Sequence, residues 1–95
     1  MTKYNSWLTN YLKQLYNRHR NREEVDSLNK KAVGHRIKTL RKKAGETQSE
    51  LGRVVGVTGS SIQQYEAGIK TPRDDIKLAI AKHYDQNVDN IFFKP

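Results

Sequence analysis

The segment from Gln48 to Glu66 contains the side chains best suited to recognising another molecule. Apolar residues recur at helical spacing on both sides of Gly56, which predicts two short helices joined by a bend that glycine allows. The second helix then turns small or amide-bearing residues outward: Gly59, Ser60, Ser61, Gln63 and Gln64. Uncharged hydrogen-bonding groups of this kind match the base edges in the major groove of DNA. The pattern therefore indicates a helix that reads bases.

The charge of the chain favours a polyanionic partner for this helix. The 95 residues include 18 Lys and Arg against 10 Asp and Glu, so the formal net charge is +8. The surplus is shared evenly along the chain, which shows that no detached basic tail is its source. Such a charge favours nucleic acid first and an anionic membrane surface second.

The sequence shows no pattern of a catalytic or metal site. It has no cysteine, which excludes disulfides and thiolate metal ligands. The histidines at positions 19, 35 and 83 share no metal-ligand spacing, and no nucleophile elbow, phosphate loop or zinc-hydrolase pattern occurs. No apolar run approaches the roughly 20 residues of a membrane span. We expect a cytoplasmic protein that is not an enzyme and uses no metal and no cofactor.

Helical signals run through the whole chain, and strand signals are poor. Helices are expected at 4–16, at 28–43 after an N-cap at Asp26 or Ser27, at 48–55, at 58–66 and from Pro72 to about Tyr84. Thr47 and Glu50 form the pattern of a capping box, and Thr58 is a second N-cap. A last short turn from Val88 contributes Ile91, Phe92 and Phe93. The fold class expected is all-α.

From about residue 33 to 92 the chain resembles the phage-repressor and Cro-type, or XRE-like, helix-turn-helix family. The matching stretches are 36–41, 47–51, 56–58, 60–66, Gly68, Thr71–Pro72 and 87–92. The resemblance implies a lambda-repressor-like DNA-binding bundle of five helices, to which this chain adds an N-terminal amphipathic helix. We therefore expect residues 1–27 to form that helix with a basic linker, and residues 28–95 to form the DNA-binding domain.

The resemblance also implies roles for individual residues. The positions that face bases are occupied by Gly59, Ser60, Ser61 and Gln64, although Gly59 has no side chain to read with. The positions expected to contact phosphates are Gln48, Thr58, Lys70 and Arg73, with Thr58 also capping its helix. Arg41 and Glu66 match a structural salt bridge between the first and third helices of the family.

The predicted N-terminal helix leaves three alternatives open. Its stripe of Tyr4, Trp7, Leu8, Tyr11 and Leu15 is too apolar to face water. The stripe could pack on its own bundle, form a subunit or partner interface, or bind a membrane surface. The C-terminal end, with Ile91 and Phe92, is a second candidate for the interface.

We interpret the chain as a sequence-specific transcriptional regulator that binds double-stranded DNA. It is expected to act as a repressor, as a homodimer on an inverted-repeat operator, with residues 58–66 in the major groove. One alternative is an antitoxin or accessory factor that binds a protein partner and uses DNA binding for autoregulation. Another is an RNA-associated or ribosome-associated adaptor of the same fold.

Overall fold

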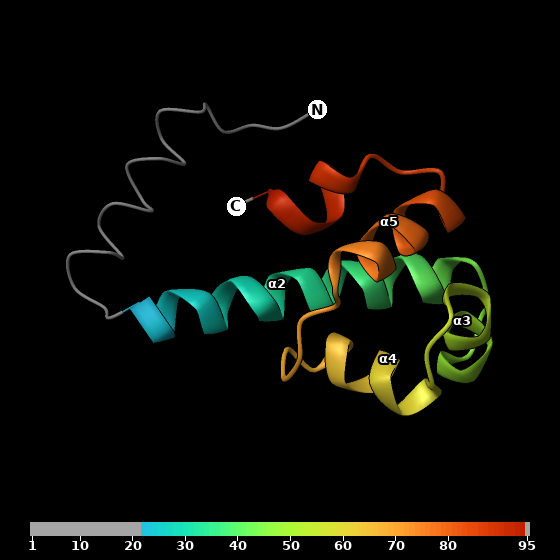
Figure 1. Cartoon of the computed structure of the whole chain (residues 1–95), viewed down its shortest axis with the longest axis horizontal. Coiled ribbons are helices and arrows are strands. Elements are labelled where there is room, and N and C mark those ends of the chain that lie inside the picture. The colour runs from blue at the N-terminus through green and yellow to red at the C-terminus, as the bar shows by residue number, and fades with distance from the viewer. Residues whose placement is uncertain (1–21, 95) are drawn as a thin grey trace.

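The computed structural model describes the backbone of residues 22–94 and the side chains from residue 28 onward. Within this range the chain is entirely helical (Figure 1). The elements are α2 (Arg22–Lys43), α3 (Gln48–Val55), α4 (Gly59–Glu66), α5 (Asp74–His83) and the π-helical turn η1 (Asp89–Phe93). The all-α bundle predicted from the sequence is therefore confirmed. None of these helices is both long and apolar enough to cross a bilayer.

The helix α2 begins at Arg22, earlier than the Leu28 expected from the sequence. The proposed caps Asp26 and Ser27 lie inside it, so that prediction was wrong. The residues between 22 and 33 include no glycine or proline, and nothing in the backbone ends a helix there. The first turns of α2 project beyond the rest of the bundle (Figure 1).

A single apolar core joins all five elements. Its fully buried side chains include Ile37 from α2, Leu51 from α3, Ile62 from α4, Ile80 from α5 and Ile91 from η1. Each element thus contributes one large apolar side chain to the same core. Tyr65 lies three residues after Ile62 on the same side of α4 and is only 4% exposed.

The α3–turn–α4 unit is built as its sequence indicates. Thr47 accepts a hydrogen bond from the backbone N–H of Glu50, and the Glu50 carboxylate accepts one from the N–H of Thr47, which completes the capping box. Gly56 ends α3 with φ of 92°, a conformation that costs other residues free energy. Gly52 allows the backbone after the turn to pack against α3, because a Cβ at this position would lie 2.6 Å from the carbonyl oxygen of Val57.

The C-terminal turn η1 closes the bundle against α2. The guanidinium of Arg36 on α2 donates to the carbonyl oxygens of Ile91, at 2.8 Å, and Lys94, at 3.1 Å. Ile91 and Phe92 are 2% and 9% exposed, so the expectation that they form an intermolecular interface was wrong. The period of the turn directs both side chains into the core, and Phe93, at 61%, is the exposed aromatic residue of this turn.

Candidate nucleic-acid interface

The N-terminus of α4 carries the partial positive charge of the helix dipole, and no acidic residue of its first turn offsets that charge. Thr58 caps it by accepting the backbone N–H of Ser61 at 3.1 Å, and its hydroxyl also donates to the Ser61 hydroxyl at 3.2 Å. The first turn contains no Asp or Glu, whereas the first turn of α3 contains Glu50. The positive end of a helix dipole, together with backbone N–H groups that have no partner, attracts anions such as phosphate.

The outward side of α4 is polar and uncharged. Ser60 is exposed, Ser61 and Gln64 are half-buried, and no hydrogen bond of the Gln64 side chain occurs within residues 22–94. The Gln64 amide is therefore available to an outside donor and acceptor. The Ser61 hydroxyl accepts from Thr58 and keeps its own O–H as a donor.

Gly59 has a packing role that the sequence did not reveal. A Cβ at this position would lie 2.8 Å from Ser49 Oγ and 3.1 Å from Ser49 Cα. The helices α3 and α4 therefore approach through the absent side chain of Gly59. Of the residues proposed to read bases, Gly59 is the one that can offer only its backbone.

An ion pair between α2 and α4 joins these two helices and also orients the side chain of Gln48 on α3. Arg41 donates to both carboxylate oxygens of Glu66, at 2.6 and 3.0 Å, so the salt bridge predicted from the sequence is formed. Gln48 Nε2 donates to the same carboxylate at 3.1 Å. Because a carboxylate only accepts hydrogen bonds, this contact fixes which end of the Gln48 amide faces inward. One N–H and the carbonyl oxygen of the amide remain for another partner.

A second polar cluster joins the α2–α3 loop to the end of α5. The Glu46 carboxylate contacts His83 Nε2 at 2.5 Å and accepts from the Tyr84 hydroxyl at 2.6 Å, and Arg41 donates to the Glu46 carbonyl at 2.7 Å. Burial alone would raise the pKa of Glu46, but the hydrogen bonds from Tyr84 and His83 and the neighbouring positive charges bring it below its ordinary value. Burial and the bond to Glu46 raise the pKa of Tyr84. The cluster fixes α3 relative to α5.

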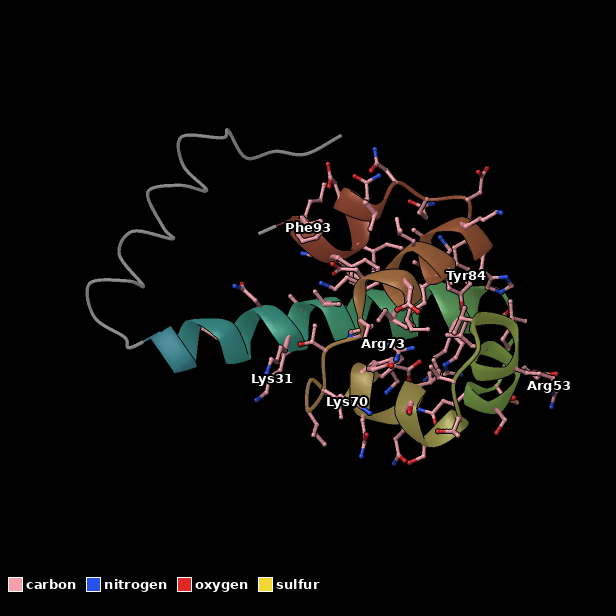
Figure 2. The ribbon with its side chains drawn as sticks, in the orientation of Figure 1. Lys31, Arg53, Lys70, Arg73, Tyr84 and Phe93 are labelled. Carbon is pink, nitrogen blue, oxygen red and sulfur yellow. The ribbon has the colours of Figure 1, made fainter. Side chains whose placement is uncertain are left out.

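Several cations surround α4. Lys70, in the loop after α4, and Arg73, just before α5, are both exposed. Arg73 contacts Asp75 at 3.3 Å, but both side chains are more than two-thirds exposed, so this pair holds the guanidinium only weakly. Lys31 of α2 lies on the same side of α2 as Lys70 and α4 (Figure 2). The α4 surface is thus neutral at its centre and basic at its edge.

A family profile described as a helix-turn-helix domain matches residues 32–90 of this chain. The chain belongs to the helix-turn-helix domain family. The matched range covers the described helices from within α2 to the start of η1, including the α3–turn–α4 unit that gives the family its name. The resemblance stated from the sequence is confirmed, including its XRE-like character.

Individual relatives agree with this assignment. The uncharacterized helix-turn-helix-type transcriptional regulator YgzD of Bacillus subtilis is 30% identical over 59 residues, which cover 62% of this chain and 89% of YgzD. A protein of Pyrococcus abyssi named as a helix-turn-helix-type transcriptional regulatory protein is 36% identical over 53 residues, but this chain spans only 17% of its length.

A solved relative shows the same arrangement of helices. The P22 c2 repressor, in a crystal structure with the synthetic operator 9T, matches with a TM-score of 0.62 and 33% identity over 63% of this chain and 91% of the repressor chain. The two chains are therefore similar in sequence as well as in the arrangement of their helices. The bundle is therefore lambda-repressor-like, as the resemblance implied.

Two parts of the helix-turn-helix site were not found by sequence reasoning. Lys31 lies far before α3 and α4 in the sequence. The packing of α2 against α4 places it beside Gly68, at the end of α4. Gly34 allows that packing, since a Cβ there would lie 2.4 Å from the carbonyl oxygen of Glu66. The residues proposed for an N-terminal interface, from Tyr4 to Leu15, lie outside the described residues. Among residues 28–94, no group of three or more His, Asp or Glu side chains could hold a metal ion.

Proposed function

We propose that this chain is a sequence-specific regulator of transcription that inserts α4 into the major groove of double-stranded DNA. The observation that supports this most directly is the uncharged outward side of α4, edged by Lys31 and Lys70. An α-helix fits the width of the major groove, and its neutral polar side chains can pair with base edges. The P22 c2 repressor was crystallised with a synthetic operator, and its similarity to this chain supports the same class of partner.

Within this proposal, the Gln64 amide reads a base. An amide offers a donor and an acceptor together, which pair with adenine in the major groove. Ser60 is the second reading residue, because its hydroxyl is exposed one turn before Gln64. Ser61 supports the cap by accepting from Thr58, and its own O–H remains free to donate to a base.

The phosphate contacts are placed around that helix. The N-terminus of α4, with Thr58 as its cap, and the remaining amide groups of Gln48 approach one strand. Lys70 and Arg73 approach the other side of the groove, and Lys31 is an additional contact. These groups fix the register of α4 and carry no sequence information themselves.

One domain of this size makes few base contacts, so we propose that two copies bind an inverted repeat. Half-sites one helical turn apart would place the two copies of α4 about 34–36 Å apart. The chain would then act as a repressor by occupying a promoter. A palindromic site enriched from a random pool of duplexes would support this arrangement.

Titration of the enriched duplex and of a scrambled duplex tests the role of Gln64. Gln64→Ala should weaken specific binding by about 1–3 kcal/mol and leave scrambled DNA nearly unaffected. Gln86→Ala, an exposed glutamine after α5, is the matched control and should change neither affinity. Lys70→Ala should weaken both affinities and reduce the slope of log K against log salt by about 1. An equal loss on both duplexes for Gln64→Ala would refute base reading by this residue.

A further inference from the structure

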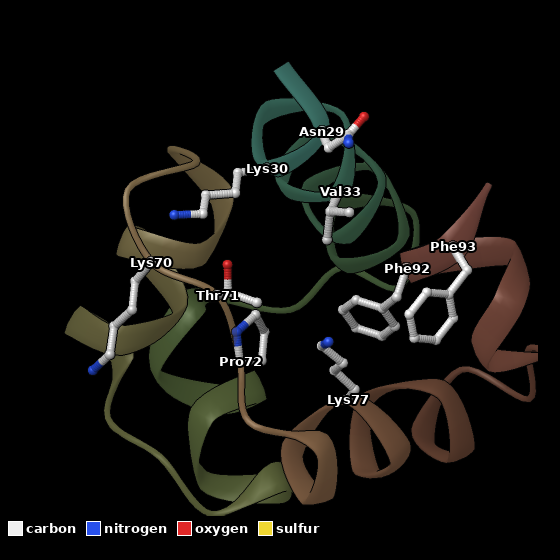
Figure 3. A pocket seen from close by; sticks show the side chains of 9 residues that line it. All are labelled: Asn29, Lys30, Val33, Lys70, Thr71, Pro72, Lys77, Phe92 and Phe93. Carbon is white, nitrogen blue, oxygen red and sulfur yellow. The ribbon is translucent and has the colours of Figure 1, made fainter. Parts of the chain in front are cut away.

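A groove opens where α2 begins to project beyond the bundle. It has a volume of about 390 Å³ and lies between α2, the loop after α4, α5 and η1. Its walls are mostly apolar, with Val33, Pro72, Phe92 and Phe93 around the stem of Lys77 (Figure 3). Phe93 is 61% exposed. This apolar surface lacks a cover within residues 22–94.

Three lysines line the groove, Lys30, Lys70 and Lys77, and Lys77 already has partners there. Lys77 Nζ lies 5.9 and 5.3 Å from the ring centroids of Phe92 and Phe93, and 3.6 Å from a carboxylate oxygen of Asp74. The rings and the carboxylate together compensate the charge of this side chain, which is only 17% exposed. The charge of Lys77 therefore needs no further partner, and the apolar wall around it is open to an apolar occupant.

The sequence before α2 provides a segment of that chemistry. The predicted helix 4–16 presents an apolar stripe that includes Trp7, Leu8 and Tyr11. Lys13 follows Leu8 by five residues, so on a helix it falls on the far side from the stripe. The tyrosine hydroxyls of the stripe can meet the lysine ammonium groups at the edge of the groove. The basic charges of this segment therefore do not oppose docking.

The tether between the two helices is short. Residues 17–21 span at most about 18 Å when extended. A 13-residue helix is about 20 Å long, which matches the length of α2 between Arg22 and about His35 at 1.5 Å per residue. A helix that turns back at Arg22 would therefore run antiparallel to the projecting part of α2 and reach Phe93. Such a tether also gives a high effective concentration, so the chain's own segment competes well with a second copy.

We propose that residues 4–16 dock as a helix within the same chain, covering the groove formed by α2, the loop after α4 and η1. The stripe then packs against Val33 and Phe93, and α2 with residues 4–16 forms a helical hairpin. The N-terminal segment is therefore a part of the domain and leaves its apolar side closed to other proteins. This inference does not depend on DNA binding.

Fluorescence of the full chain without DNA tests the proposal, because Trp7 is the sole tryptophan. Emission should be blue-shifted relative to the chain in urea and should not change with protein concentration. Phe93→Glu should shift the emission to the red and increase quenching by acrylamide, with the helical content of residues 22–94 retained. Val54→Glu, at a position 58% exposed on α3, is the matched control and should leave the emission unchanged. Val33→Gln, on the α2 wall of the groove, is a second variant that should act like Phe93→Glu.

Three results would overturn the proposal. Emission of the wild-type chain at the wavelength of the urea-unfolded chain would show that Trp7 is not covered. If emission shifts to the red on dilution while light scattering shows a dimer dissociating, the stripe packs against a second copy of the chain instead. Unchanged emission in both Phe93→Glu and Val33→Gln would place the stripe elsewhere.

Discussion

Replacement of Arg41 by methionine should strongly destabilise the domain. The Arg41 and Glu66 side chains are 10% and 4% exposed, and they share two hydrogen bonds of 2.6 and 3.0 Å. Methionine has a similar length but leaves the Glu66 carboxylate with Gln48 Nε2 as its only remaining hydrogen-bond donor in the described part of the chain. It also removes the donor to the Glu46 carbonyl.

The size of the effect follows from the uncompensated charge. Removing one partner of a buried pair costs about 3–5 kcal/mol, because the other charge remains desolvated. In a domain of this size, each kcal/mol lowers the midpoint of thermal unfolding by about 4–8 °C. The double variant Arg41→Met/Glu66→Met should lose less than the single variant, because an apolar pair leaves no buried charge. The exposed pair gives the contrast, and Arg73→Met should change stability by less than about 1 kcal/mol.

Urea denaturation followed by circular dichroism measures these differences, and a double-mutant cycle isolates the coupling of the pair. A loss below about 1 kcal/mol for Arg41→Met would refute the reasoning, because it would mean that the pair is solvated. A double variant whose loss equals the sum of the two single losses would also refute it.

Two further perturbations test other contacts. Gly34→Ala should destabilise the domain by about 1–3 kcal/mol despite the better helix propensity of alanine, because its Cβ would lie within 2.5 Å of the carbonyl oxygens of Tyr65 and Glu66. Thermal unfolding checks this against Lys38→Ala at an exposed position of the same helix, and equal stabilities would contradict it. Because the pKa of Glu46 is lowered on folding, its contribution to stability is complete above its ordinary value of 4.5 and is lost as the pH falls through the lowered value. The stability difference between wild type and Glu46→Gln should therefore shrink below about pH 4.5 in urea titrations, and a difference independent of pH would count against the cluster.

Local patterns predicted the parts of the fold that depend on neighbouring residues. The capping box at Thr47, the cap at Thr58 and the bend at Gly56 each depend on groups only a few residues apart. The start of α2 was misplaced because residues 22–27 are mostly polar and leave little periodic signal. Ile91 and Phe92 were assigned to an interface because the sequence gives their apolar character but not the direction in which a short turn presents them.

Within residues 28–94 the sequence by itself determined the positions of the helices, the bend between α3 and α4, and the uncharged outward side of α4, because helical period and capping act over short distances. The tertiary structure decided which distant groups meet. Gly34 fits against the end of α4, Gln48 shares a carboxylate with Arg41, and Phe93 stays outside while Phe92 is buried. These pairings depend on the approach of helices that lie far apart in the chain, and no local periodicity encodes that approach.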